Sequence, residues 1–167
     1  MDKLIDEVKI SGDDVMVDPD VYKGFMKALV HVFRNSLDHG IEYVYEREDC
    51  GKDKVGRIDC AVSRLGDEIK ICILDDGRGI DFAKVKRIAV DKGLYSEKTI
   101  EAMDDNELSK LIFMSDFSTR EAVSELSGRG FGLAAVMEEV NKLRGRIEVD
   151  SEAGKGTTFK FFIQYMG

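Results

Sequence analysis

The most restrictive pattern in the sequence is a pair of alternating stretches on either side of a short turn. Apolar residues alternate with polar ones over residues 58–62 and again over 69–73, and Leu65-Gly66-Asp67 between them has the composition of a turn. The alternating apolar residues are Ile58, Cys60, Val62, Ile69, Ile71 and Ile73. Because successive side chains of a strand point to opposite faces, this pattern predicts a β-hairpin with one buried face. Such a face needs a second layer to cover it.

A long amphipathic helix is predicted to supply that layer. Asp18 is a good N-cap residue, and Pro19 fits the first helical turn. The positions that follow recur every three or four residues and form one buried stripe. The stripe consists of Val21, Phe25, Leu29, Val32, Phe33, Ser36 and Leu37. Gly40 is predicted to end the helix as a left-handed cap.

The remaining elements predict the architecture. We expect short strands at 8–10 and 15–17 around a turn, helices at 82–92, 106–114 and from 132 onward, and strands at 146–151 and 157–165. The polar stretch 46–56 has the composition of a linker between elements. This order favours an α/β (α+β) two-layer sandwich, in which helices cover one face of a mixed, largely antiparallel sheet.

Length and charge limit the class of protein. The 167 residues correspond to a single domain, at about 150 residues per domain. The net charge of −8 argues against nonspecific binding to nucleic acid or to anionic membranes. No apolar run approaches the roughly 18 residues that span a bilayer, and the first ten residues do not resemble a signal peptide. We therefore expect a cytoplasmic protein with no nucleic-acid partner and no direct membrane insertion. Three cysteines without a CxxC pair indicate neither a disulfide framework nor a zinc site.

A polar row on the long helix is the first candidate site. His31, Asn35 and His39 are four residues apart, so in an α-helix they share a face, with Arg34 and Asp38 beside it. An asparagine oxygen is a suitable ligand for Mg²⁺, which usually keeps water and phosphate as its other ligands. A solvated helix face is the alternative interpretation of this row.

Three glycine-containing segments are the other candidates. Asp75 follows the predicted strand 69–74 and begins the sequence Asp-Asp-Gly-Arg-Gly, so its carboxylate could accept a hydrogen bond from an exocyclic amine such as that of adenine. Residues 128–132 read Gly-Arg-Gly-Phe-Gly at the start of a helix, where amide groups favour phosphate. Residues 154–157 read Gly-Lys-Gly-Thr. Taken singly, these segments could equally be an acidic turn, a flexible turn and a hairpin turn.

In combination, the motifs resemble the ATP-binding catalytic domain of chemotaxis-type (CheA-like) histidine kinases. Five segments match in order and spacing: 31–42, 75–81, Phe117-Ser118-Thr119, 127–132 and 154–157. The resemblance extends from about residue 15 to residue 163. It implies membership of the superfamily of gyrase, chaperone, histidine-kinase and mismatch-repair ATPases, and hence the Bergerat fold with a mobile ATP lid at about 81–127.

The resemblance also implies roles for individual residues. Asn35 would bind Mg²⁺, Asp75 would hold the adenine amino group, and Lys84 would face the phosphates. The implied catalytic residues are His31, Asn35, His39 and Lys84. The implied ATP-binding residues are Arg34, Asp38, Asp75, Gly77, Gly79, Ile80, Ser118, Thr119, Arg120, Gly128, Arg129, Gly130, Phe131, Gly132, Leu133 and Thr157. Solvated surface charge is the alternative for Lys84 and Arg120.

Two departures from the family pattern qualify the resemblance. Ser115-Asp116 stands where chemotaxis kinases usually have Pro-Gly, and Leu133-Ala134 stands where they commonly have Met-Asp. Leu-Ala is typical of ordinary sensor kinases. We therefore expect a fragment of a hybrid or divergent sensor kinase with a CheA-like catalytic domain. It would use ATP and Mg²⁺, with a phosphoacceptor-histidine domain and a response regulator as partners. His31 and His39 are its only histidines, and neither lies in an acceptor-like sequence.

Other functions remain open on the sequence alone. ATP hydrolases of the gyrase or chaperone kind use a glutamate where this chain has His31, so water activation is expected to be poor. A nucleotide-binding regulatory module with little catalysis is a second alternative. A serine kinase of the anti-sigma type is a third, although its chain lacks the pattern at 31–42.

Overall fold

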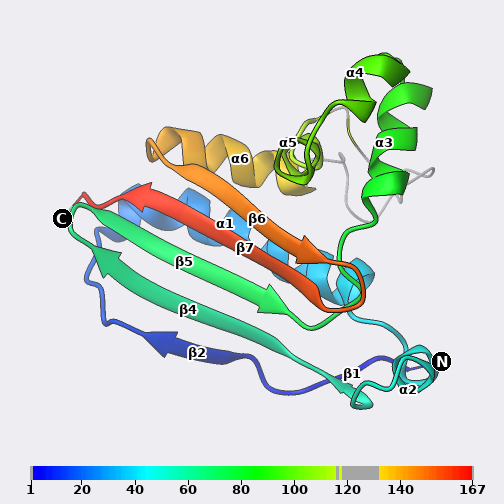
Figure 1. The fold of residues 1–167 in the computed structure, drawn as a ribbon. Helices are drawn as coiled ribbons and strands as arrows, with labels where there is room; N and C mark the ends of the chain where they lie inside the picture. Colours follow the sequence, from blue (N-terminus) through cyan, green and yellow to red (C-terminus); the bar gives the residue numbers. More distant parts are fainter. Residues whose placement is uncertain (1, 116, 118–131, 167) are drawn as a thin grey trace, which may run out of the picture.

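The structure is a computed structural model that describes residues 2–115, 117 and 132–166. Its main sheet has five strands in the order β2 (Lys9–Gly12), β4 (Ile58–Leu65), β5 (Glu68–Asp75), β7 (Gly156–Gln164) and β6 (Arg146–Glu152). Only β2 and β4 are parallel among these neighbours. Helices α1 (Pro19–Asn35) and α6 (Gly132–Lys142) lie on one face of the sheet (Figure 1). The predicted two-layer architecture is confirmed.

The predicted hairpin forms the centre of the sheet. Strands β4 and β5 pair from Ile58↔Asp75 to Leu65↔Glu68, and the turn between them holds Gly66 at a φ of 62°. Its inward-facing apolar residues are buried with the side chains of α1 and α6 in the main core. Strand β7 adds Phe159, Phe161 and Ile163 to the same face. Alternation along β5 also places Asp75 on this inner face, at the end of an apolar row.

Helix α1 begins as predicted. The Asp18 carboxylate accepts a hydrogen bond from the backbone N–H of Asp20 at 2.9 Å, and Pro19 occupies the first turn. Most of the predicted stripe is at least partly buried, but Val21 is 40% exposed and Tyr22 lies in the core instead. The helix therefore turns a slightly different face toward the sheet near its start.

The end of the helix differs from the prediction. Residues Ser36–Gly40 form a π-helical turn, η1, which the N–H of Ile41 closes by donating to the carbonyl of Ser36 at 2.7 Å. Gly40 has no positive φ, so its predicted role as a left-handed cap is wrong. The wider turn leads directly into the extended backbone at Ile41, and the Gly40 carbonyl accepts a hydrogen bond from the N–H of Arg78 at 2.9 Å.

The N-terminal segment does not form the expected pair of strands. Strand β2 pairs with β4 in parallel, whereas residues 15–17 lie outside any strand. Gly12 has a φ of 114°, and the next N–H, that of Asp13, donates to Val62 as the chain leaves the sheet. Val15 and Val17 then pack against the main core instead of pairing.

The stretch predicted as a linker is structured. Helix α2 (Val44–Asp49) occupies its first part, and strand β3 (Val55–Gly56) pairs in parallel with β1 (Leu4–Ile5). Arg47 on α2 is almost completely buried. This segment therefore belongs to the packed domain.

Three helices follow β5 and form a second apolar cluster. These are α3 (Phe82–Asp91), α4 (Glu97–Glu101) and α5 (Asp105–Leu111), which confirms the helices predicted at 82–92 and, with an earlier end, at 106–114. Figure 1 shows them grouped at one end of the sheet. The buried members of the cluster are Val85, Ala89, Ile100, Leu108, Leu111 and Phe117. The first part of the proposed ATP lid thus has its own apolar core.

Candidate functional site

The carboxylate of Asp75 is the centre of the candidate site. Asp75 is 3% exposed, and its carboxylate accepts hydrogen bonds from Ser36 Oγ at 2.7 Å and from the N–H of Gly77 at 3.1 Å. The backbone of Thr157, its neighbour on β7, provides a further hydrogen bond. Burial raises the pKa of Asp75 above its ordinary value, against the opposing effect of these bonds. The result is a buried, oriented hydrogen-bond acceptor.

The backbone approaches Asp75 so closely that two neighbouring positions require glycine. A Cβ atom on Gly77 would lie 2.2 Å from the carbonyl oxygen of Gly40, and one on Gly156 would lie 1.9 Å from that of Asp75. Gly156 also has a φ of 116°. A side chain is therefore excluded at both of these positions.

Hydrogen bonds fix the loop that follows Asp75 to the end of β6 and to the turn between β6 and β7. The N–H of Ile80 donates to Ser151 Oγ at 2.8 Å, and the N–H of Gly154 donates to the carbonyl of Arg78 at 2.8 Å. Ser151 Oγ also lies 3.1 Å from Thr157 Oγ1. Since Arg78 is bonded to η1 as well, the loop joins the helix layer to the end of the sheet.

The polar row predicted on the first helix is divided between two helix types. His31 and Asn35 are partly buried on α1, with Arg34 exposed, whereas Asp38 and His39 are exposed on η1. Residues 38 and 39 of the row therefore stand on the wider π-helical turn that follows α1.

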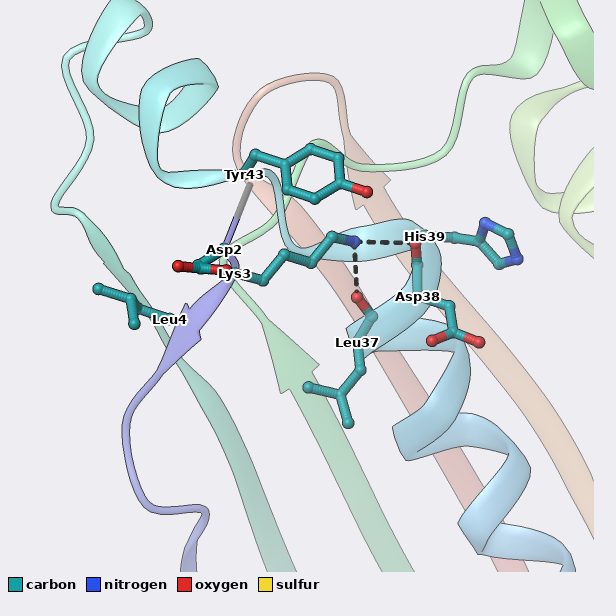
Figure 2. Close-up of a pocket in the computed structure, with 7 residues that line it drawn as sticks. All are labelled: Asp2, Lys3, Leu4, Leu37, Asp38, His39 and Tyr43. Carbon is teal, nitrogen blue, oxygen red and sulfur yellow. Dashed lines mark hydrogen bonds between the residues drawn. The ribbon is translucent and has the colours of Figure 1, made fainter.

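A cavity of about 750 Å³ lies beside η1 (Figure 2). Its lining consists of Asp2, Lys3, Leu4, Leu37, Asp38, His39 and Tyr43. Lys3 Nζ donates to the carbonyls of Leu37 and Asp38 at 2.8 and 2.9 Å, and lies 5.2 Å from the centre of the Tyr43 ring. Burial lowers the pKa of Lys3, and the nearby Arg78 lowers it further. The cavity shares Asp38 and His39 with the predicted site but does not include Asp75.

The structure brings together only part of the predicted set. Asp75, Gly77, Gly79, Ile80 and Thr157 meet at the ends of β5 and β7. Lys84 is exposed in the first turn of α3, where its N–H donates to the Asp81 carboxylate, while Gly132 and Leu133 begin α6. The predicted residues Ser118, Thr119, Arg120, Gly128, Arg129, Gly130 and Phe131 lie outside the described residues.

Two hydroxyl groups that hydrogen-bond within the candidate site were not predicted from the sequence. Ser36 was assigned to the apolar stripe of the helix, and Ser151 to an ordinary strand. A serine within an apolar stripe is the signal that could have identified Ser36, because a buried hydroxyl group needs a hydrogen-bond partner. No local pattern distinguishes Ser151, whose partners come from other segments of the chain.

The helix offers one oxygen ligand that suits a magnesium ion whose remaining ligands are water and phosphate. Among residues 2–115, 117 and 132–166, no group of three or more His, Cys, Asp or Glu side chains is arranged to hold a metal. Mg²⁺ typically takes one or two protein oxygens and fills its other positions with water and substrate phosphate. The amide oxygen of Asn35 can provide one such ligand.

Comparison with known proteins decides the family. Residues 26–166 match the family model of histidine kinase-, DNA gyrase B-, and HSP90-like ATPases. The chain belongs to this family. The resemblance inferred from the five motifs is confirmed, and with it the assignment to a histidine-kinase type of ATPase domain.

Curated relatives of this ATPase domain include chemotaxis kinases. The chain is 41% identical over 157 residues to the sensor histidine kinase CheAY of Helicobacter pylori, covering 94% of this chain and 20% of that protein. It is 42% identical over 160 residues to the chemotaxis protein CheA of Borreliella burgdorferi, covering 96% of this chain and 18% of that protein. The ATPase domain therefore spans about a fifth of the length of these relatives.

Solved structures show the same fold at low sequence identity. The mycobacterial sensor histidine kinase MprB aligns with a TM-score of 0.56 and 17% identity, covering 95% of this chain and 81% of that chain. The blue-light-activated histidine kinase of Erythrobacter litoralis EL346 aligns with a TM-score of 0.56 and 16% identity, covering 99% of this chain and 36% of that chain. In the part of this chain that the structure describes, no helix is long and apolar enough to cross a membrane.

Proposed function

We propose that this ATPase domain binds Mg-ATP and transfers the γ-phosphoryl group to a histidine on a separate phosphoacceptor domain in two-component signalling. The observation that carries the proposal is the Asp75 carboxylate, which is buried at the meeting point of helix, loop and sheet and is oriented by Ser36, Gly77 and Thr157. We further propose a cytoplasmic location and a response regulator as the downstream partner.

At the base end of the site, Asp75 would accept a hydrogen bond from the exocyclic amino group of adenine. A buried acceptor of this kind discriminates against a base that lacks the amino group, because its desolvated oxygen would then be left unpaired. Thr157 and the loop at 77–80 would form the walls around the base. The close approaches at Gly77 and Gly156 leave no side chain between the backbone and Asp75.

At the phosphate end, Asn35 would hold Mg²⁺, which when bound neutralises charge on the phosphates. His31, His39, Lys84 and Arg34 are the described residues proposed to contact or face the phosphate groups. The family resemblance also assigns Asp38 and Leu133 to the nucleotide site. The proposal extends to Ser118, Thr119 and Arg120, and to the segment from Gly128 to Gly132, through the family motifs in which they stand. In phosphoryl transfer the protein contributes mainly positioning and stabilisation of charge.

The acceptor would come from another domain or another chain. In the transfer, a bond forms between the γ-phosphorus and an acceptor imidazole nitrogen, the bond to the bridging oxygen breaks, and ADP leaves. The chain has two histidines: His31 lies on α1 with Asn35, and His39 lies on the η1 turn that follows it. They are therefore assigned to the ATP-binding side of the reaction.

Phosphotransfer with γ-labelled ATP tests the proposal. The purified chain is incubated with labelled ATP and Mg²⁺, with and without a phosphoacceptor-histidine domain taken from a CheA relative. Label is expected on the acceptor domain alone, with little release of free phosphate because His31 stands where hydrolases of this superfamily have a glutamate. Rapid labelling of the chain itself would contradict the separate acceptor, and rapid phosphate release without transfer would favour a hydrolase.

Asn35→Asp is the matched variant for this assay. The substitution keeps the size of the side chain but places a negative charge beside the phosphates, so Mg²⁺-dependent transfer should fall by about tenfold or more. Unchanged nucleotide affinity and unchanged transfer in this variant would favour a nucleotide-binding module over a kinase.

A further inference from the structure

Two cationic side chains outside the family motifs, one buried and one partly buried, contact the loop that follows Asp75. The side chain of Arg47 is 1% exposed and that of Lys52 is 17% exposed. Both belong to the segment whose composition resembles a linker. Removing a charge from water is unfavourable unless the charge is paired and hydrogen-bonded. The partners of these two side chains therefore indicate what they do.

The two cations and their carboxylate partners form one connected hydrogen-bond network. Arg47 donates to the Glu42 carboxylate at 3.0 Å and to that of Asp76 at 2.9 Å. Lys52 Nζ donates to the other oxygen of Glu42 at 2.7 Å. Two cations thus face two carboxylates, and the network carries no net charge when all four groups are ionised.

Lys52 also binds the backbone of the loop that follows Asp75. Its Nζ donates to the carbonyl of Asp76 at 2.9 Å and to the carbonyl of Gly77 at 2.7 Å. Arg47 contributes a longer bond, of 3.4 Å, to the carbonyl of Asp76. The lysine therefore holds two consecutive peptide groups through their oxygen atoms.

The N–H groups of the same two peptides point into the candidate site. A trans peptide is planar and directs its N–H opposite to its carbonyl oxygen. The peptide between Asp76 and Gly77 donates to Asp75 at 3.1 Å, and the next one donates from Arg78 to the carbonyl of Gly40 at 2.9 Å. Each bond from Lys52 thus orients and polarises a peptide whose other end fixes the site.

We propose that Lys52, supported by Arg47, is a positioning residue for base recognition: it fixes the Asp76–Gly77 peptide so that its N–H orients the Asp75 carboxylate. This inference rests on the proposed function, because it takes Asp75 to be the acceptor for the amino group of adenine. The hydrogen bonds of Lys52 go to Glu42 and to the carbonyls of Asp76 and Gly77, not to Asp75. Its effect is transmitted through one peptide group.

Base selectivity distinguishes this role from general structural support. Calorimetric titration in the presence of Mg²⁺ gives dissociation constants for ADP and for inosine 5′-diphosphate, whose base lacks the exocyclic amino group. The wild-type chain should prefer ADP by about tenfold or more, because a charged acceptor left unpaired weakens binding by that order. A wild-type chain without this preference would overturn the proposed function itself.

Lys52→Met is the decisive variant. We expect its affinity for ADP to fall by about five- to tenfold and its affinity for inosine 5′-diphosphate by less than about twofold, so that selectivity is largely lost. Lys52→Arg, which keeps the charge and several donors, should recover part of the selectivity. Equal weakening of both ligands in Lys52→Met, or full retention of selectivity, would overturn the inference.

A neighbouring lysine serves as the matched control. Lys54 is 63% exposed, and its ion pair with Glu48 is on the surface, so Lys54→Met should bind both ligands like the wild type. Thermal unfolding of each variant verifies that it is folded. Should Lys52→Met fail to fold, Lys52→Gln, which retains a donor without the charge, must show the same loss of selectivity for the inference to stand.

Discussion

Replacing Asp75 with asparagine tests whether its carboxylate recognises the nucleotide. Asparagine has nearly the same shape, but it lacks the charge and presents an amide donor on one side. A buried hydrogen bond to a charged group contributes about 1.5–3 kcal/mol, so the dissociation constant for ADP should rise roughly 10- to 150-fold. Calorimetric titration with ADP and Mg²⁺ measures this change directly.

The same substitution should have a much smaller effect on stability. One of the donors around Asp75 loses its acceptor in the variant, which costs about 1–2 kcal/mol. The variant also no longer buries an ionised carboxylate, and this change acts in the opposite direction. We expect the free energy of unfolding, measured in urea, to change by less than about 2 kcal/mol.

The pH dependence provides a second test of the same group. Since burial raises the pKa of Asp75, the folded state holds its proton more tightly than the unfolded state does. The contribution of this group to stability is therefore fully present below the ordinary pKa of 3.8 and is lost as the pH rises through the raised pKa. Binding should have the opposite dependence, because the carboxylate accepts from adenine best when it is ionised.

Comparison of the wild-type chain with Asp75→Asn separates the titration of Asp75 from that of the nucleotide and of other carboxylates. Relative to Asp75→Asn, the wild-type chain should lose affinity for ADP as the pH falls through the raised pKa, while gaining stability. If Asp75→Asn bound ADP as tightly as the wild-type chain at neutral pH, Asp75 would not be the acceptor for the base.

Three further substitutions, one of them with a matched control, test the surroundings of the site and the packing of the core. Ser36→Ala removes the 2.7 Å hydrogen bond to Asp75 and should weaken ADP binding about three- to tenfold in a titration; unchanged affinity would contradict an orienting role for this hydroxyl group. Gly156→Ala would place a Cβ atom 1.9 Å from a carbonyl oxygen at a φ of 116°. The control, Gly154→Ala, has open space at a φ of 79° and should cost about 1–2 kcal/mol in urea unfolding. Gly156→Ala should destabilise the chain well beyond this control, and equal losses would refute the close packing. Phe25→Ala, at a fully buried core position, should lower the free energy of unfolding by about 3–5 kcal/mol, and a loss below about 1 kcal/mol would contradict the packing of α1 on the sheet.

Elements governed by local chemistry were predictable from the sequence. Asp18 and Pro19 fixed the start of α1, and strict alternation identified β4, β5 and the turn at Gly66. Asp75 was predicted to follow the strand 69–74, and in the structure it is the last residue of β5. These features depend on propensities and periodicities within one segment of the chain.

Features governed by distant contacts were not predictable. Residues 46–56 are too polar to indicate an element, yet they include most of α2 and all of β3. Arg47 and Lys52 in this segment meet carboxylates and carbonyls from other segments. The parallel pairing of β1 with β3, and the π-helical turn that ends at Gly40, likewise depend on partners that no local pattern specifies. Ser36 could be assigned to a buried stripe, but its bond to Asp75 spans 39 positions.

Mapping amide chemical shifts on addition of ADP and Mg²⁺ tests the location of the site most directly. The largest changes should fall on Gly77, Gly79, Thr157 and the helix residues near Asn35, while the hairpin turn at Gly66 stays unchanged. Changes confined to the cavity lined by Lys3 and Tyr43, or absent throughout, would contradict an adenine nucleotide site centred on Asp75.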